Sequence, residues 1–210
     1  MDRRDFIKNG SLLVLVSSNQ TVSAAQKLLP TPSETAGPFY PVIEQKDKDF
    51  DLSQIKGRLV KAKGKIIEIS GHVIDTTGQA LEDVSVELWQ ANAAGRYQHS
   101  GDTNSAPIDK NFQGWAIVPT NSQGAFRFKT VLPGAYAVSN HWARPPHIHF
   151  KLVKPGFAEL TTQMYFPDEA LNDVDRLLMR KSSQERQSMI ARADDKRNDI
   201  FYFQVVMQTQ

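Results

Sequence analysis

The chain of 210 residues contains no cysteine. This absence excludes disulfide bonds, zinc sites built on thiolates and cysteine nucleophiles, and it leaves the redox compartment undetermined by thiols. Any metal that this chain holds is expected to accept nitrogen and oxygen ligands rather than thiolate.

Charge of one sign and long apolar runs are also scarce. The sequence has 25 basic and 23 acidic residues, a net charge of +2, and no basic stripe of the kind that binds nucleic acid. No run approaches the roughly 18 apolar residues that a membrane span requires. A composition that is 40% hydrophobic and 23% charged is that of an ordinary globular protein. We therefore expect one folded domain, with neither nucleic acid nor a membrane span involved.

Residues 1–25 resemble a twin-arginine export signal. Arg3 and Arg4 precede a short apolar run and a small-residue stretch within residues 12–24, which is the order that such signals follow. We expect export to the periplasm, with a mature chain that begins near Ala25. A cytoplasmic protein with a disordered basic terminus is the alternative.

Residues 26–64 are predicted to form an extended arm on the domain surface. Four of the chain's 11 prolines fall within residues 30–41, and proline disfavours helix both at its own position and at the one before it. The segment 34–41 is rich in aromatic residues for a linker, so we expect it to close one side of a pocket.

Residues 65–210 are predicted to form a single β-sandwich domain. Val84, Val86 and Leu88 alternate with more polar neighbours, which indicates a strand with one buried and one mixed face. A pair of strands at 114–118 and 124–130 is separated by a polar turn. Further strands are expected at 66–75 and 200–207.

Helical signals appear only near the C-terminus. Asp168 is expected to cap a segment that reaches Leu178, and Ser182 with Glu185 has the spacing of a capping box. The fold class is therefore mainly β, a sandwich of mixed or antiparallel strands with a helical excursion near the C-terminus.

Two histidines stand one residue apart at the start of an alternating strand. Period-two geometry places His147 and His149 on one face, while Ile148 and Phe150 point the other way into a core. Two neutral imidazoles side by side suggest a metal site. For an isolated pair, however, an exposed strand face is the more common explanation.

The further candidate ligands are few: the other histidines are His72, His99 and His141, and two separate loops offer Tyr97 and Tyr136. A phenol has a pKa of about 10, so only a strongly polarising cation holds it as phenolate near neutral pH. Two imidazoles and two phenolates would select Fe(III) by hardness and charge. Taken singly, each tyrosine is more often a half-buried aromatic with a hydrogen-bonded hydroxyl.

Several motifs, in the correct order, resemble the intradiol ring-cleavage dioxygenases, most of all subunits of the protocatechuate 3,4-dioxygenase beta type. The likeness runs from about Thr31 to the C-terminus. The four blocks that carry it are Leu88-Trp89-Gln90-Ala91-Asn92-Ala93-Ala94-Gly95-Arg96-Tyr97, Asn111-Phe112-Gln113-Gly114, Pro133-Gly134-Ala135-Tyr136 and Arg144-Pro145-Pro146-His147-Ile148-His149-Phe150. Residues 37–41 and 162–166 extend it.

This resemblance implies a mononuclear Fe(III) bound by Tyr97, Tyr136, His147 and His149. It also implies that Tyr136 leaves the metal when a catechol binds, so that this residue is both a ligand and a base. The Arg144 guanidinium would stabilise negative charge on the activated ring.

Three further implications concern the reaction and its partners. Gln163 matches a family position beside the substrate and could orient a bound oxygen species. The reaction would cleave a catechol-type ring, in protocatechuate or a related diphenol, with O2 to a cis,cis-muconate. The family enzyme pairs two different subunits, so an oligomer is expected, with a homologous subunit as one possible partner.

One departure from the pattern bears on the substrate, and a second resemblance bears on the function. Val138 stands where protocatechuate enzymes carry a tryptophan, which weakens the case for protocatechuate itself, and Trp142 is a candidate to fill the gap. Residues 71–89 also resemble strands of transthyretin-like modules. A non-catalytic transthyretin-like β-sandwich that binds a ligand is therefore the alternative function.

Overall fold

The computed structural model describes residues 27–210, so the predicted export signal lies outside the described part of the chain. Within residues 27–210, no helix has the length and apolar character to cross a membrane. The elements are β1 (Ile66–Asp75), β2 (Ser85–Trp89), β3 (Trp115–Pro119), β4 (Ala125–Val131), β5 (Tyr136–Ser139), β6 (Trp142–Arg144), β7 (His147–Val153), β8 (Leu160–Tyr165), the 3-10 helices η1 (Ala170–Val174) and η2 (Leu178–Arg180), α1 (Ser183–Met189), β9 (Arg192–Ala193) and β10 (Ile200–Met207).

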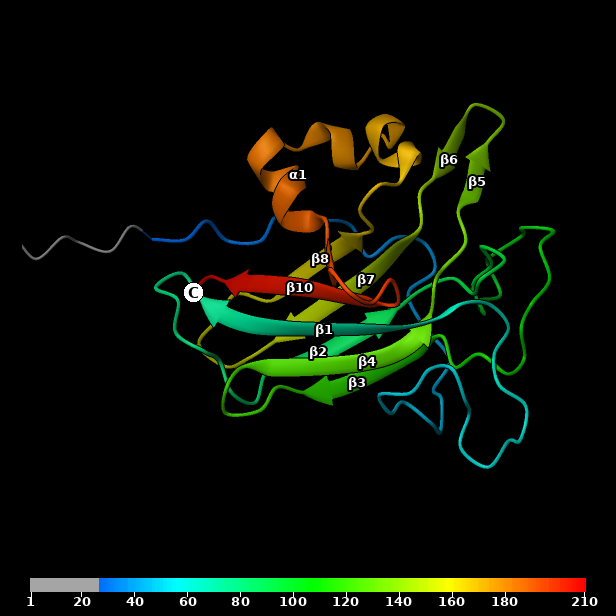
Figure 1. Ribbon diagram of the computed structural model, residues 1–210, viewed down its shortest axis with the longest axis horizontal. Coiled ribbons are helices and arrows are strands. Elements are labelled where there is room, and N and C mark those ends of the chain that lie inside the picture. The colour runs from blue at the N-terminus through cyan, green and yellow to red at the C-terminus, as the bar shows by residue number, and fades with distance from the viewer. Residues whose placement is uncertain (1–26) are drawn as a thin grey trace, which may run out of the picture.

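Two four-stranded sheets form the layers of a sandwich, as Figure 1 shows. One sheet has the order β4-β1-β10-β9 and the other the order β3-β2-β7-β8. The β1–β10 pair is parallel, and the other pairs in the two sheets are antiparallel. The predicted mainly β sandwich of mixed and antiparallel strands is therefore confirmed.

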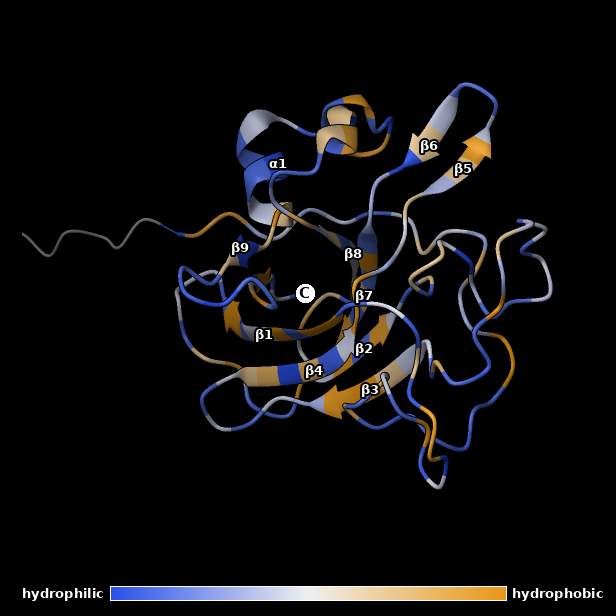
Figure 2. Cartoon of the chain, turned by 45° about the vertical axis from the view of Figure 1, so that its right-hand side comes forward, coloured by the Kyte–Doolittle hydropathy of each residue, from blue (hydrophilic) through white to orange (hydrophobic). Residues whose placement is uncertain are grey.

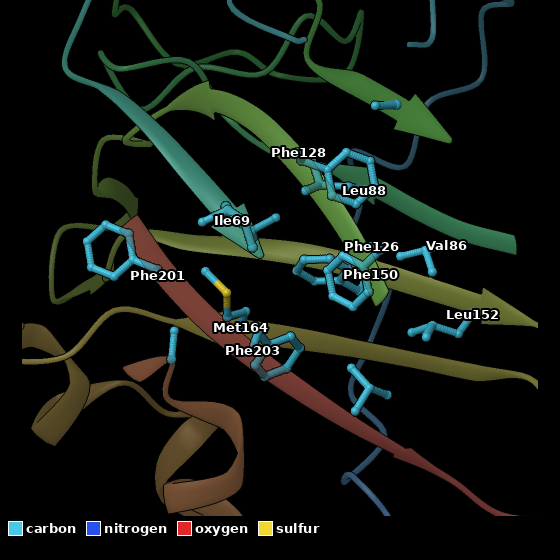
Figure 3. Packing of buried hydrophobic residues seen from close by; sticks show 14 of the residues in the cluster. Ile69, Val86, Leu88, Phe126, Phe128, Phe150, Leu152, Met164, Phe201 and Phe203 are labelled. Atoms are coloured by element: carbon cyan, nitrogen blue, oxygen red, sulfur yellow. The ribbon is translucent and has the colours of Figure 1, made fainter. Parts of the chain in front are cut away.

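Aromatic side chains join the two sheets in the core (Figure 3). Phe150 of β7 has its ring centroid 5.9 Å from that of Phe126 of β4 and 5.3 Å from that of Phe203 of β10. Since β4 and β10 belong to one sheet and β7 to the other, these contacts cross between the layers. Figure 2 shows hydrophobic residues concentrated on the strands and hydrophilic residues on α1.

The predicted strand patterns are mostly confirmed, with one difference in pairing. Val84, Val86 and Leu88 are fully buried while Ser85 is exposed. The strands expected at 114–118 and 124–130 exist as β3 and β4, but they lie in different sheets. Their polar turn therefore crosses from one layer to the other, a choice that local turn chemistry does not determine.

The helical excursion is confirmed, although one of its predicted caps is wrong. Ser182 and Glu185 form both hydrogen bonds of the capping box at the start of α1. Asp168 caps no helix. The helix η1 begins at Ala170, and its N-cap residue is Glu169, which makes no side-chain cap. Asp168 instead has a positive φ of 58°, in the left-handed region that aspartate tolerates better than most residues.

The predicted arm is held against both sheets. The Thr31 N–H donates to the Val206 carbonyl of β10, and the Glu34 N–H donates to the Thr161 carbonyl of β8. Further along, Leu52 is fully buried in the main core cluster. The boundaries 26–64 and 65–210 stay a prediction.

A short hairpin of β5 and β6 projects from the sandwich next to the helical excursion (Figure 1). The hairpin begins at Tyr136 and ends at Arg144, and these two residues are partners in its register. It therefore places a candidate metal ligand beside a candidate catalytic cation, at one end of the sheet that contains β7.

Candidate metal centre and active site

Strand β7 has a different chemistry on each face. Ile148, Phe150 and Leu152 join the main core cluster. His147 and His149 face away from that cluster and are nevertheless only 2% and 3% exposed. The second face of this strand is therefore covered, and the explanation of an exposed histidine pair does not hold.

The loop that follows β2 delivers Tyr97. Its backbone N–H donates to Asp102 Oδ2 at 2.7 Å, which fixes this turn of the loop. Gly95 has a φ of 77°, and a Cβ atom there would lie 2.3 Å from the Ala135 carbonyl oxygen. Only glycine allows this close approach, which brings the loop of Tyr97 against the segment that leads into Tyr136.

Four aromatic rings from three parts of the chain meet at this point. The Tyr97 and Tyr136 centroids are 5.8 Å apart, those of Tyr136 and His147 5.6 Å, and those of His147 and His149 5.0 Å. Tyr97 and His149 close the group at 6.2 Å. The structure thus brings together all four side chains that the sequence singled out as ligands.

Three polar atoms of this group are buried without a hydrogen-bond partner: Tyr97 Oη, His147 Nε2 and His149 Nδ1. The other ring nitrogen of His147 is held by the Pro145 carbonyl oxygen at 2.7 Å, so its Nε2 is the free position. Buried polar groups in proteins nearly always have partners. Unpaired phenol and imidazole atoms on neighbouring rings therefore fit a bound cation.

Phenols are essential to such a site. Across residues 27–210, no three histidine, aspartate or glutamate side chains are grouped so that they could hold a metal ion. A cation at this position would have only two imidazoles without Tyr97 and Tyr136.

Burial shifts the pKa of each of these groups toward its neutral form. It lowers the pKa of His149 to about 3 and that of His147 well below its usual value, and the nearby Arg144 charge adds to both shifts. Burial also raises the pKa of Tyr97, helped by Tyr136, and raises the pKa of Tyr136 itself. Neutral imidazoles are ready to bind a metal, whereas the phenols ionise only for a strongly polarising cation.

Arg144 is the centre of a buried polar network. Its Nε donates to Asp175 Oδ2 at 2.7 Å, and its Nη2 donates to Gln163 Oε1 and Tyr165 Oη, each at 2.7 Å. Burial opposes the positive charge, but the Tyr165 and Asp175 side chains raise the pKa of Arg144 above its ordinary value. The guanidinium is thus a fixed cation beside the four rings.

Gln163 is fully engaged in this network. Its Oε1 accepts from Arg144 and from Tyr165, and its Nε2 donates to the Thr35 carbonyl oxygen at 2.8 Å. The side chain is completely buried. These contacts suit a residue that positions Arg144.

Sequence reasoning missed Asp175 and gave Tyr165 no role. Asp175 is fully buried, and its second oxygen accepts from the Leu177 and Leu178 N–H groups at 2.9 Å. It lies 31 residues after Arg144, within the helical excursion, so no local pattern connects the two. Tyr165 stood within a family-like block, but its hydroxyl contact with Arg144 appears only in three dimensions.

A cavity of about 640 Å3 opens beside the group. Tyr136, Arg144 and His149 contribute to its wall, and Val138 and Trp142 of the hairpin contribute further out. The remaining lining residues come from the arm, from the loop that follows Tyr97, from the hairpin and from the helical excursion: Thr35, Gly37, Pro38, Phe39, Asp102, Thr103, Asn104, Ser105, Ala137 and Leu177. The expectation that the arm closes one side of a pocket is confirmed.

Two contacts hold His149 from behind. The indole of Trp89 stacks on its ring with centroids 4.9 Å apart and an interplanar angle of 11°. Gly37 of the arm has a φ of 71°, and a Cβ atom there would lie 3.3 Å from His149 Cε1. The imidazole is therefore fixed between β2 and the arm.

Comparisons with known proteins identify relatives of this chain. A family model described as Dioxygenase matches residues 35–208. The chain is 46% identical over 111 residues to the protocatechuate 3,4-dioxygenase beta chain of Burkholderia cepacia, a match that covers 51% of this chain and 47% of the relative. It is 30% identical over 175 residues to the chlorocatechol 1,2-dioxygenase of Cupriavidus pinatubonensis, covering 74% of this chain and 63% of the relative. The matched part thus spans less than two thirds of each relative.

Solved structures give the same result for the fold. The dioxygenase domain of a carbohydrate-binding fusion protein from Streptomyces sp. SirexAA-E superimposes with a TM-score of 0.63 at 26% identity, covering 86% of this chain and 99% of that one. The 3-chlorocatechol 1,2-dioxygenase of Rhodococcus opacus superimposes with a TM-score of 0.68 at 21% identity, covering 89% and 75%. At 21% identity the second comparison supports the fold alone.

Proposed function

Because the chain belongs to the intradiol ring-cleavage dioxygenase family, we propose that it is an Fe(III)-dependent enzyme that cleaves a catechol-type ring with O2. The ring would open between the two hydroxyl-bearing carbons to give a cis,cis-muconate. The observation that carries this proposal is the group of unpaired buried atoms on Tyr97, His147 and His149, next to Tyr136 and the fixed Arg144 charge.

Tyr97, Tyr136, His147 and His149 would hold the iron. When bound, Fe(III) supplies the Lewis acidity that ionises a catechol and makes its ring reactive toward O2. Tyr136 is partly exposed in the cavity wall, whereas Tyr97 is only 4% exposed. Of the two phenols that would hold the metal, Tyr136 would therefore be the one placed to act also as a base and accept a substrate proton at its Oη.

Arg144 would stabilise negative charge that develops on the bound ring. Its Asp175 and Gln163 contacts fix the guanidinium before substrate arrives, so the charge needs no reorganisation during the reaction. That Gln163 orients a bound oxygen species stays a prediction, and its contacts favour a role in positioning Arg144.

Metal analysis and oxygen uptake test the proposal together. Purified protein should contain about one iron per chain and show the red-brown colour of phenolate-to-Fe(III) charge transfer. Adding a catechol should consume O2 and yield a muconate rather than a semialdehyde. Colourless, iron-free protein that consumes no O2 with any catechol would support the transthyretin-like binding module instead.

We also propose export through the twin-arginine route, with a periplasmic location. This rests on Arg3 and Arg4 and on the residues that follow them. Cell fractionation should find a shortened chain in the periplasm, and changing both arginines to lysine should retain the full-length chain inside the cell. Finding only uncleaved wild-type protein in the cytoplasm would contradict export.

An oligomer, with itself or with a homologous subunit, is proposed from the family resemblance. Light scattering measures the mass of the purified chain in solution, alone and after co-expression with a homologous subunit. A monomer under all conditions would contradict this proposal.

A further inference from the structure

We propose that the cavity selects catechols that carry an uncharged, apolar ring substituent and disfavours those that carry a ring carboxylate. This inference rests on the proposed function and names the substrate class of that same site. It comes from the charges and the apolar side chains that line the cavity.

Within residues 27–210, the cavity wall offers no free cation to a carboxylate. Among the lining residues that the structure describes, Arg144 is the one lysine or arginine. It forms a buried ion pair with Asp175 and also donates to Gln163 and Tyr165. Arg144 is also the register partner of Tyr136, so it lies at the end of the cavity where the diphenol hydroxyls would bind.

Asp102 adds a carboxylate to the same wall. Its two oxygens accept from the Tyr97 and Asn104 N–H groups at 2.7 and 2.9 Å, which fixes its position. No ion pair to Asp102 is found in the part of the chain that the structure describes. A carboxylate on the substrate would enter the field of this like charge without a compensating cation.

Apolar side chains form the outer part of the cavity. Val138 and Trp142 come from the two strands of the hairpin, and Leu177 comes from the helical excursion that packs next to it. Val138 is 49% exposed, so a substrate substituent could still remove much of its surface from water. An alkyl, halogen or aryl group suits this surface, and a carboxylate does not.

Two other features agree with a substituted, neutral diphenol. The cavity of about 640 Å3 lies within the range of roughly 300–1,000 Å3 typical of sites for drug-sized ligands, so a single unsubstituted ring leaves space. The metal site would bind the hydroxyl end of every diphenol alike. Discrimination between ring substituents therefore depends on the outer wall.

Arg176 is a cation that contacts a residue of that outer wall, Trp142. Its guanidinium carbon lies 5.3 Å from the centroid of the Trp142 ring, and it does not line the cavity. Stacking on the indole occupies this cation without presenting it to the cavity. Substitution of Arg176 therefore tests whether this cation binds a substrate carboxylate.

Anaerobic titration of the iron-loaded full chain separates binding from turnover. The charge-transfer band should shift with 4-methylcatechol at a concentration at least tenfold lower than with 3,4-dihydroxybenzoate. With O2 present, kcat/KM should show a preference of the same sense. Equal or better binding of the dihydroxybenzoate would overturn the substrate class even if both compounds are cleaved. Binding of the neutral diphenol without O2 uptake would support the class and contradict the dioxygenase activity.

A charge substitution at the outer wall tests the cause. Val138→Lys should raise the ratio of kcat/KM for dihydroxybenzoate over methylcatechol at least tenfold relative to Val138→Met, a neutral side chain of similar length. Equal ratios in the two variants would overturn the electrostatic explanation. Arg176→Gln should leave the wild-type ratio unchanged, and a fall in that ratio would show that Arg176 binds the carboxylate after all.

Discussion

The two faces of β7 are buried almost equally, but only one of them, the histidine face, carries polar atoms that lack hydrogen-bond partners. Ile148 and Phe150 are fully buried among apolar partners, so that face needs nothing more. His147 and His149 are 2% and 3% exposed, and each retains a ring nitrogen without a partner. A buried unsatisfied polar group costs about 1–3 kcal/mol, a cost that a bound metal would offset. One strand thus contributes stability through one face and a binding site through the other.

The largest expected effect follows from His149→Ala, on the histidine face of β7. Removing one of four ligands should abolish bound iron and its colour, and with them O2 uptake. Metal analysis and the visible spectrum provide the measurement. His72→Ala, which removes an exposed histidine of β1, is the matched control and should keep both iron and activity. Iron retained in the His149 variant would show that the ligand set is different.

On the apolar face of β7, Phe150→Ala should lower the stability of the fold and leave the site intact. Loss of a core phenylalanine typically costs about 3–5 kcal/mol of unfolding free energy, which a denaturant titration measures. Iron content per folded chain should stay near that of the wild type. Leu59→Ala, at a side chain that is 97% exposed, should change stability by less than about 0.5 kcal/mol. A Phe150 variant that loses iron at full stability would break the distinction between the two faces.

Asp175→Asn tests whether the Arg144 network contributes both to stability and to turnover. The substitution keeps the shape of the side chain but leaves a buried guanidinium without its counter-charge, which typically costs about 3–5 kcal/mol. Turnover should slow while iron and colour remain. In contrast, Asp199→Asn breaks an exposed pair with Arg197, which water screens, and should leave stability nearly unchanged. Equal stability of the two variants would contradict the buried ion pair.

A further expected effect is the pH dependence of the stability of metal-free protein. The folded-state pKa of His149 is about 3, below the unfolded value of about 6.5. The unfolded chain therefore binds one more proton between these values, and stability should fall as the pH falls through this window. The slope from this residue is up to about 1.4 kcal/mol per pH unit. Denaturant titrations from pH 7 to 4 should show a shallower slope for His149→Ala, and identical slopes would contradict a neutral buried imidazole.

The sequence predicted the face of β7 that each side chain occupies because strand geometry alternates side chains regardless of context. It also predicted the capping box of α1, in which Ser182 and Glu185 are three residues apart and interact locally. The cap at Asp168 was wrong, and the strands on either side of the 120–123 turn lie in different sheets. In both cases tertiary packing overrode a weak local preference.

The sequence by itself determined which chemistry the protein could hold. Without cysteine, and with two histidines on one strand face, a metal here depends on nitrogen and oxygen ligands. Only the tertiary structure decided that Tyr97 and Tyr136 meet those histidines, that Asp175 holds Arg144, and that Val138 and Trp142 line the cavity. The physical reason is separation along the chain: a repeat of two residues fixes the direction of neighbouring side chains, whereas contacts tens of residues apart depend on how the two sheets and the hairpin pack.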